Sequence, residues 1–198
     1  MKKLFFATNN QNKVEEIRSI ISDQFDVVSL KEAGIDIDIP EPHNTLEENA
    51  SEKSQTIYRL TGENCFSEDT GLETEALHGE PGVKSARYAG EGKSANDNIE
   101  KLLQALHGVE NRKARFRTVI SAIINGEEQL FSGTCEGYIG LEPKGEKGFG
   151  YDSIFIPAGD TRTFAEMSLA DKNRFSHRKK ALARLLAFLS KEENKIYQ

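Results

Sequence analysis

Two adjacent carboxylates, Glu68 and Asp69, directly follow a short apolar run, and a threonine and a glycine come next. The run Asn64 to Ser67 predicts a strand, so the acids are expected where it ends, at a sheet edge that often carries catalytic groups. Carboxylate oxygens suit a hard cation such as Mg2+, which takes one or two of them with phosphate oxygens and water. Further acids are present at Glu41, Glu47 and Glu48. The alternative is a solvated acidic loop, and Glu48 fits a helix cap better than a metal ligand.

A polar turn separates an expected strand, Lys3 to Ala7, from a helix that contains Lys13 near its start. The turn consists of Thr8, Asn9, Asn10, Gln11 and Asn12. Unpaired backbone N–H groups, a helix N-terminus and a lysine in one place form an anion-binding site. This stretch has no glycine-rich Walker loop, so a phosphate would rely on asparagine and threonine side chains as well as on the backbone. In the alternative interpretation, Asn9 and Asn10 are only turn and cap residues.

Two further segments carry groups that suit a flat base and phosphate. In the first, Phe149 and Tyr151 alternate with glycines before Asp152, so the backbone can approach a ring while an aromatic side chain stacks on it. The second, residues 172–180, holds five Lys or Arg and no acid, and it predicts a local basic pocket. Its candidate donors are Lys172, His177 and Arg178. The alternatives are a turn with a packed phenylalanine, and a solvated tract or weak nucleic-acid patch.

Composition narrows the class of protein. The 198 residues are 37% hydrophobic and 29% charged, which indicates a soluble globular chain with a sizeable core. The net charge of -6 argues against a general nucleic-acid or anionic-membrane binder. The longest apolar run near the start, Leu4 to Ala7, is too short for a secretory or membrane segment. Because the two cysteines, Cys65 and Cys135, fit a reducing compartment, we expect a cytoplasmic protein.

Hydrophobic periodicity predicts helices and strands around these segments. The apolar faces of four expected helices are Val14, Ile17, Ile20 and Ile21; Leu46, Ala50, Ile57 and Leu60; Ile99, Leu102, Leu103 and Leu106; and Ala181, Leu182, Leu185, Leu186 and Leu189. Thr45 and Ser94 are the expected caps of the second and third helices. Further strands are expected at residues 26–30, 114–124, 130–138 and 153–156, with Asn125-Gly126 as a hairpin turn.

Parallel and hairpin-paired strands together predict a mixed α/β (α+β) fold. A sheet covered by helices is expected, with two lobes and a central cleft. Because the sequence has no repeat and no linker, residues 1–198 are expected to form a single domain.

Taken together, these segments resemble the Ham1-like family of inosine/xanthosine triphosphate pyrophosphatases. The resemblance runs almost from end to end and rests on six stretches in family order. They are ATNNQNKVEEI, EPHNTLEENA, SEDTGLETEAL, PGVKSARYAG, GFGYDSIF and TFAEMSLADKNRFSHRKKA. It implies a hydrolase that converts the non-canonical purine nucleoside triphosphates ITP, dITP and XTP to the monophosphate and pyrophosphate, which cleanses the nucleotide pool. It also implies an elongated mixed sheet and a homodimer, without a nucleic-acid or membrane partner.

The resemblance implies a role for each matching residue. The triphosphate is assigned to Thr8 through Lys13, and magnesium to Glu41 and Asp69. Asp69 would also be the proton acceptor, and Thr70 would contact the substrate. The base is assigned to Phe149, Gly150, Tyr151 and Asp152, and both base and phosphates to Lys172, His177 and Arg178. The sequence does not separate the role of Glu68 from that of its neighbour.

The implied chemistry is attack of a water molecule on the α-phosphorus, with Asp69 orienting or deprotonating the water and pyrophosphate leaving. Donors from His177 or Arg178 to a 6-keto oxygen would disfavour adenine, because its amino group would meet them donor to donor. Two other functions stay open at this point. One is a magnesium-dependent phosphatase that releases inorganic phosphate from nucleotides, and the other is a non-catalytic nucleotide or nucleic-acid binding module.

Overall fold

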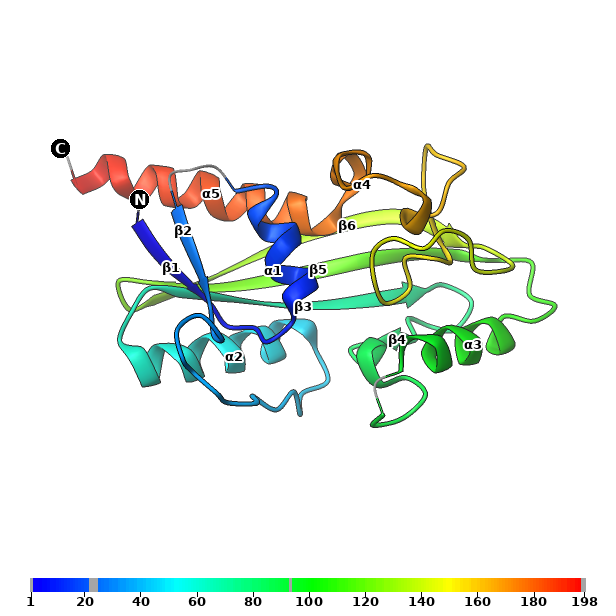
Figure 1. Cartoon of the computed structure of the whole chain (residues 1–198), viewed down its shortest axis with the longest axis horizontal. Coiled ribbons are helices and arrows are strands. Elements are labelled where there is room, and N and C mark those ends of the chain that lie inside the picture. The colour runs from blue at the N-terminus through cyan, green and yellow to red at the C-terminus, as the bar shows by residue number, and fades with distance from the viewer. Residues whose placement is uncertain (1, 22–24, 93, 197–198) are drawn as a thin grey trace. The chain divides into compact units, whose positions relative to one another are not determined.

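The computed structural model describes residues 2–21, 25–92 and 94–196 (Figure 1). The chain divides into two compact units. Unit 1 comprises Met1–Asp69, Thr118–Gly133 and Arg178–Gln198, and unit 2 comprises Thr70–Arg117 and Thr134–His177. Three long strands contribute residues to both units: β3 (Cys65–Thr74), β5 (Lys113–Ile124) and β6 (Glu127–Ile139). None of the helices in the described ranges has the length and apolar content of a membrane span.

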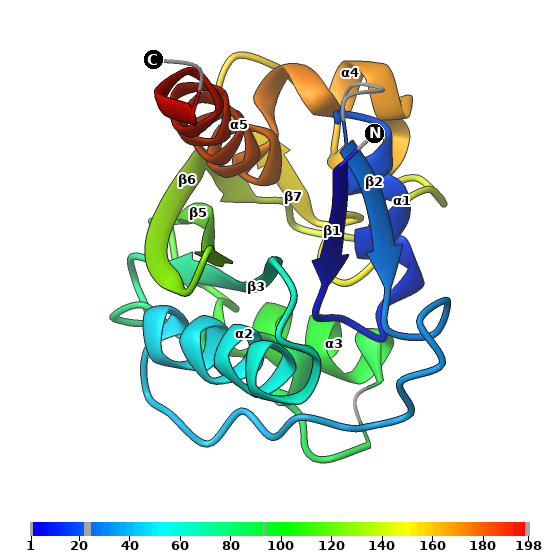
Figure 2. The same ribbon diagram turned by 90° about the vertical axis from the view of Figure 1, so that its left-hand side faces the viewer.

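Unit 1 is a sheet with helices on both faces. Its other elements are β1 (Lys2–Phe6), β2 (Phe25–Ser29), α1 (Gln11–Arg18), α2 (Leu46–Thr61) and the part of α5 (His177–Ile196) that begins at Arg178. The strand order is β2-β1-β3-β5-β6, and β1 runs parallel to both of its neighbours. Successive side chains of a strand point to opposite faces. Leu4 and Phe6 of β1 accordingly pack with α1 and α5, whereas Phe5 and Ala7 pack on the side of α2 (Figure 2).

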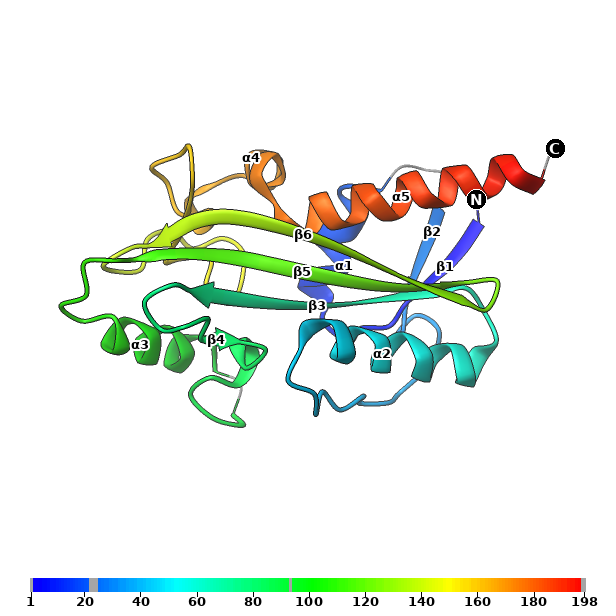
Figure 3. The same cartoon turned by 180° about the vertical axis from the view of Figure 1, so that it is seen from behind.

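Unit 2 is built on the remaining parts of the three long strands. It adds β4 (Pro81–Gly82), β7 (Phe155–Pro157), α3 (Ala95–Ala105), α4 (Leu169–Phe175) and two 3-10 turns, η1 (Ser85–Arg87) and η2 (Phe164–Glu166). β4 is antiparallel to β3, and β7 is antiparallel to β6. Figure 3 shows α3 on one side of the long strands and α4 on the other. One cluster of buried residues, including Leu102 of α3, Phe116 of β5 and Phe164 of η2, forms its core.

Local signals explain most of the element boundaries. Asn10, Thr45 and Ser94 each accept a hydrogen bond from the backbone N–H three residues on, so the expected caps are confirmed. Asn125 and Gly126 adopt φ values of 52° and 85°, the positive angles that a two-residue hairpin between β5 and β6 requires. The fold class, a mixed sheet flanked by helices, is confirmed.

Four expectations about these elements need correction. Ile20 and Ile21 were expected on the apolar face of the first helix, but α1 ends at Arg18, before both residues. Leu60 was expected on the buried face of α2 but is 58% exposed, because the last turn of that helix buries nothing after Ile57. The strand expected at residues 153–156 begins two residues later as β7, after a turn at residues 151–154. The start of the basic tract overlaps a separate helix, α4, that hydrophobic periodicity did not indicate, because it is only 7 residues long.

The most consequential correction concerns β3. The strand was expected to end near Ser67, but it continues to Thr74, so Glu68 and Asp69 lie in its middle and are buried. Continuation is possible because Gly71 lets β4 approach closely: an ideal Cβ at this position would lie 2.7 Å from the Gly82 carbonyl oxygen. A solvated acidic loop is therefore excluded for these two carboxylates.

Gly71→Ala is expected to destabilise the protein by about 1 to 3 kcal/mol, the usual cost of forcing an extra carbon into a packed site. Urea unfolding would measure the change. Gly92→Ala is the matched control, because a Cβ at Gly92 meets nothing within 4 Å. Equal stability of the two variants would contradict this account of the β3 to β4 contact.

Candidate active site

The first group of candidate residues in unit 1 lies on the α2 side of β3. Lys53 of α2 places its Nζ 2.5 Å from Glu41 Oε1 and 3.5 Å from Asp69 Oδ1. Asn49, one turn earlier in α2, is hydrogen-bonded to Asp69. One cationic nitrogen is therefore shared by the two carboxylates that the family resemblance assigned to magnesium, and the structure brings this pair together.

Sequence reasoning missed Lys53 and Asn49. Both lie on the stripe of α2 that also contains Leu46, Ala50 and Ile57, at helical spacings of three and four residues. A lysine on the buried face of a helix is expected to place its ammonium against a carboxylate, because an unpaired buried charge is costly. That position in the pattern was the available signal.

The environment of Asp69 favours proton uptake. The side chain is buried in the middle of β3, and burial raises the pKa of its carboxyl group above the ordinary value. Lys53 and Lys13 oppose this effect by stabilising the anion, and the negative charge of Glu41 adds to it. Asp69 is consequently a stronger base than an exposed aspartate.

The neighbouring carboxylate, Glu68, points to the opposite face of β3 and meets different partners. Arg178, the second residue of α5, donates from Nε and Nη2 to the two Glu68 oxygens at 2.7 and 2.9 Å. Its third nitrogen, Nη1, donates to Glu16 of α1. Lys13 Nζ lies 3.1 Å from Glu68 Oε1. The four side chains form a buried chain of alternating charges, in which only Lys13 retains partial exposure.

Charge pairing outweighs burial in this chain. Burial acts to raise the pKa of Glu68, but Arg178 and Lys13 hold it well below its usual range, so Glu68 stays ionised. Burial likewise acts to lower the pKa of Arg178, and Glu68 and Glu16 raise it above its usual value. Both Glu68 oxygens thus have cationic partners, which separates its role from that of Asp69.

The polar turn between β1 and α1 has a partly structural role. Asn10 caps α1 by accepting from the Lys13 N–H at 3.3 Å, and Thr8 Oγ1 accepts from the Asn10 N–H at 3.1 Å. Asn9 Nδ2 donates to the Ile37 carbonyl at 2.8 Å, which ties the turn to the segment that leads to Glu41. Gln11 and Asn12 open the helix and are exposed. The first turn of α1 therefore presents backbone N–H groups and Lys13 beside the carboxylates of β3.

The chemistry of this donor set fits a divalent cation. Within the part of the chain that the structure describes, no three His, Cys, Asp or Glu residues come together as a complete metal-binding group. Glu41 and Asp69 nevertheless approach one cation position, now held by the Lys53 ammonium, and both offer oxygen. Magnesium typically takes only one or two carboxylates and completes its shell with phosphate oxygens and water. The residues present therefore suit a metal that arrives with a phosphorylated substrate.

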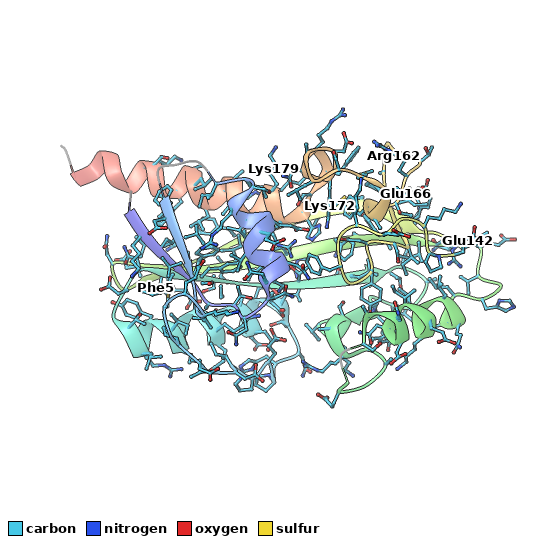
Figure 4. The ribbon with its side chains drawn as sticks, viewed as in Figure 1. Phe5, Glu142, Arg162, Glu166, Lys172 and Lys179 are labelled. Atoms are coloured by element: carbon cyan, nitrogen blue, oxygen red, sulfur yellow. The ribbon has the colours of Figure 1, made fainter. Side chains whose placement is uncertain are left out.

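In unit 2, Lys172 of α4, labelled in Figure 4, contacts the segment at residues 149–152. Lys172 Nζ donates to Asp152 Oδ2 at 2.6 Å, and the Phe149 N–H donates to the same oxygen at 2.9 Å. Residue 148 must be a glycine here, because an ideal Cβ at this position would lie 2.1 Å from Asp152 Oδ2. Tyr151 is buried and donates its hydroxyl hydrogen to the Ser85 carbonyl at 2.9 Å. Phe149 and Gly150 remain at least partly exposed.

The predicted basic pocket is divided between two environments, each neutralised by carboxylates. Lys172 is buried on Asp152 in unit 2, and Arg178 is buried on Glu68 and Glu16 in unit 1. Lys179 and Lys180 are exposed.

His177 is buried in unit 2, where its ring stacks on Phe116 with centroids 4.8 Å apart. Thr70 follows Asp69 in β3 and is half-buried. Each unit therefore brings its own predicted residues together, and neither places all the cations in one patch.

Comparison with known proteins identifies the family. A family model described as "Ham1 family" matches residues 4–188 of the chain. A dITP/XTP pyrophosphatase of Porphyromonas gingivalis is 50% identical over 190 residues, covering 96% of this chain and 98% of that protein. The protein of that name from Bacillus subtilis is 44% identical over 193 residues, again covering 96% of this chain and 98% of the relative.

Solved structures of Ham1 proteins are also similar to this chain. The Ham1 protein of Staphylococcus aureus superposes with a TM-score of 0.86 at 42% sequence identity, covering 96% of this chain and 100% of that one. A HAM1 protein of Coxiella burnetii gives a TM-score of 0.87 at 34% identity, with the same coverage. The chain belongs to the Ham1 family.

Arg178→Met is expected to lower the free energy of unfolding by about 3 to 5 kcal/mol, because it leaves the buried Glu68 and Glu16 carboxylates without their shared cation. Denaturant unfolding followed by circular dichroism would measure the loss. Arg59→Met, which removes an exposed guanidinium 3.5 Å from Glu52, is the matched control and should unfold like the parent protein. A stability loss no larger than that of the control would contradict the buried charge chain.

Proposed function

We propose that this protein hydrolyses non-canonical purine nucleoside triphosphates, namely ITP, dITP and XTP, to the nucleoside monophosphate and pyrophosphate. The observation that carries the proposal is the arrangement around β3 in unit 1. Asp69 is buried, its pKa is raised, and its carboxylate contacts the same Lys53 ammonium as Glu41 does. Lys13 lies near the start of α1 in the same unit. The names of the family relatives support the same reaction and the same class of substrate.

Asp69 is the proposed proton acceptor. Glu41 and Asp69 would hold Mg2+, which supplies neutralisation of negative charge on the phosphate oxygens. Asp69 orients a water molecule and takes one of its protons as the water oxygen bonds to the α-phosphorus. The bond from that phosphorus to the bridging oxygen breaks, and pyrophosphate leaves with the bonding electron pair.

Lys13 and the first turn of α1 are the proposed triphosphate-binding groups. The ammonium and the helix N–H groups attract phosphate oxygens, with further contacts from the turn at Thr8 through Asn12 and from Thr70. Glu68 then has a positioning role, because its carboxylate is 3.1 Å from Lys13 Nζ and is itself fixed by Arg178. Arg178 was expected to donate to the base, but its nitrogens donate to Glu68 and Glu16. In this proposal it therefore acts on phosphate binding through Glu68 and Lys13.

The residues of unit 2 are the proposed base-binding groups. Phe149 and Gly150 are accessible to a flat ring, whereas Tyr151 and Asp152 hold the segment in shape through Ser85 and Lys172. Donors from Lys172 or His177 to a 6-keto oxygen would meet the amino group of adenine donor to donor. Such a mismatch leaves buried polar groups unpaired at about 1 to 3 kcal/mol each, and this penalty disfavours ATP. We further propose that the enzyme works as a cytoplasmic homodimer.

The products distinguish this function from its alternatives. Incubation with dITP and magnesium ions should yield dIMP and pyrophosphate, identified by chromatography. Orthophosphate and dIDP would instead indicate a phosphatase that attacks the terminal phosphorus. Stoichiometric binding without turnover would indicate a binding module, and a nucleic-acid module would also show a steep salt dependence.

Asp69→Asn should abolish nearly all turnover of dITP while the fold survives, because the amide neither accepts a proton at neutral pH nor carries charge for a metal. Steady-state kinetics and circular dichroism would test both parts. Asp26→Asn, an exposed change on β2, is the control and should retain full activity. Near-normal turnover by Asp69→Asn would remove this residue from the mechanism.

Lys13→Ala should raise the KM for dITP by about tenfold or more, the effect of losing one charged hydrogen bond to phosphate. A fall in kcat would show that the contact strengthens in the transition state. Glu68 keeps its bidentate Arg178 partner in this variant, so the fold should persist. Lys31→Ala, an exposed change in the same unit, supplies the control. Unchanged kinetics would mean that the turn is only structural.

A further inference from the structure

An aromatic cluster in unit 2 surrounds two of the proposed base-binding donors. Phe116 of β5, Phe155 of β7 and Phe164 of η2 pack on one another, with ring centroids separated by 4.7 to 6.1 Å. All three rings are buried in the core of this unit. Neither the resemblance nor the comparisons give any of these phenylalanines a role.

The imidazole of His177 lies in this cluster. Its ring is stacked on Phe116 at 4.8 Å with an interplanar angle of 17°, and on Phe164 at 6.4 Å with an angle of 27°. Only 3% of the residue is exposed. Because both neighbours are nearly parallel to the imidazole, they restrict rotation of the ring and set the directions in which its nitrogens point.

The ammonium of Lys172 contacts the same cluster. Lys172 Nζ lies 5.2 Å from the centroid of Phe164 and 5.3 Å from that of Phe149, and it donates to Asp152 at 2.6 Å. The ring faces attract the cation, and the carboxylate fixes its distance from residues 149–152. Phe164 therefore touches both donors, Phe116 touches only His177 through ring stacking, and Phe155 has a ring contact with neither.

We infer that Phe164 is a specificity-determining positioning residue: it aligns His177 and Lys172 so that a 6-keto purine is accepted and a 6-amino purine is rejected. This inference rests on the proposed function. Discrimination by hydrogen bonding requires donors held close to one geometry, because a misplacement of about 1 Å removes most of the advantage of the correct base. A smaller, flexible side chain in place of Phe164 would free both donors at once.

The test compares Phe164→Leu with Phe155→Leu, which removes the same ring from the same core without touching either donor. For each variant, kcat/KM is measured with dITP and with dATP, and the products are identified. Phe164→Leu should lower the ratio of the two values by about tenfold, equivalent to about 1.4 kcal/mol. Phe155→Leu should lower the melting temperature but keep the ratio of the parent protein. Phe116→Leu should give an intermediate loss, because it loosens only His177.

Two outcomes would overturn the inference. One is an unchanged ratio in Phe164→Leu, and the other is an equal loss of the ratio in Phe164→Leu and Phe155→Leu, which would reflect general loosening of the core. If Phe164→Leu does not fold, Phe164→Met, which nearly conserves volume but lacks the ring, decides in the same way. Failure of the proposed function would appear in the parent protein itself, as equal use of dITP and dATP or as products other than pyrophosphate.

Discussion

The alternation of side chains along β3 is the constraint on which the rest of the site depends. Glu68 and Asp69 are adjacent in sequence and both buried, but a strand sends successive side chains to opposite faces. Glu68 consequently meets α1 and α5, and Asp69 meets α2. On opposite faces the two carboxylates have different cations in direct contact: Arg178 and Lys13 for Glu68, and Lys53 for Asp69.

The opposite faces give the two carboxylates different chemistry. On one face, Arg178 and Lys13 overcome burial and keep Glu68 ionised, which makes it a fixed anchor. On the other face, burial dominates and the pKa of Asp69 rises in spite of Lys53. Neighbouring acids whose environments push their pKa values apart are a common way to separate a structural charge from a proton acceptor. The two neighbouring carboxylates of β3 thereby differ in their protonation behaviour, which is the basis for assigning them different roles in the proposed function.

Much of this arrangement was predictable from local sequence signals. Capping residues such as Thr45 and the Asn125-Gly126 turn act through bonds within a few residues, so their patterns identified the elements correctly. The family motifs supplied the segments that are proposed to act on the substrate. The pairing of Glu41 with Asp69 followed from the resemblance, and the structure supports it through their shared contact with Lys53.

The remaining features depend on contacts between distant residues. The continuation of β3 past Ser67 requires Gly71 to admit Gly82, and nothing near residue 71 reveals that approach. The basic tract was expected to be one pocket because its residues are close in sequence, but Lys172 and Arg178 are drawn to different carboxylates, Asp152 and Glu68. The partners are 20 residues apart in the first pair and 110 in the second, and hydrophobic periodicity carries no information on contacts between such distant residues.

Attack of water on the α-phosphorus, the step assigned to Asp69, is tested most directly by the fate of the water oxygen. Hydrolysis of dITP in 18O-labelled water, followed by mass spectrometry of the products, locates the bond that water forms. The account predicts that the label enters the phosphate of dIMP and that the pyrophosphate stays unlabelled. Label in pyrophosphate, or in released orthophosphate, would show attack at another phosphorus and would contradict the account.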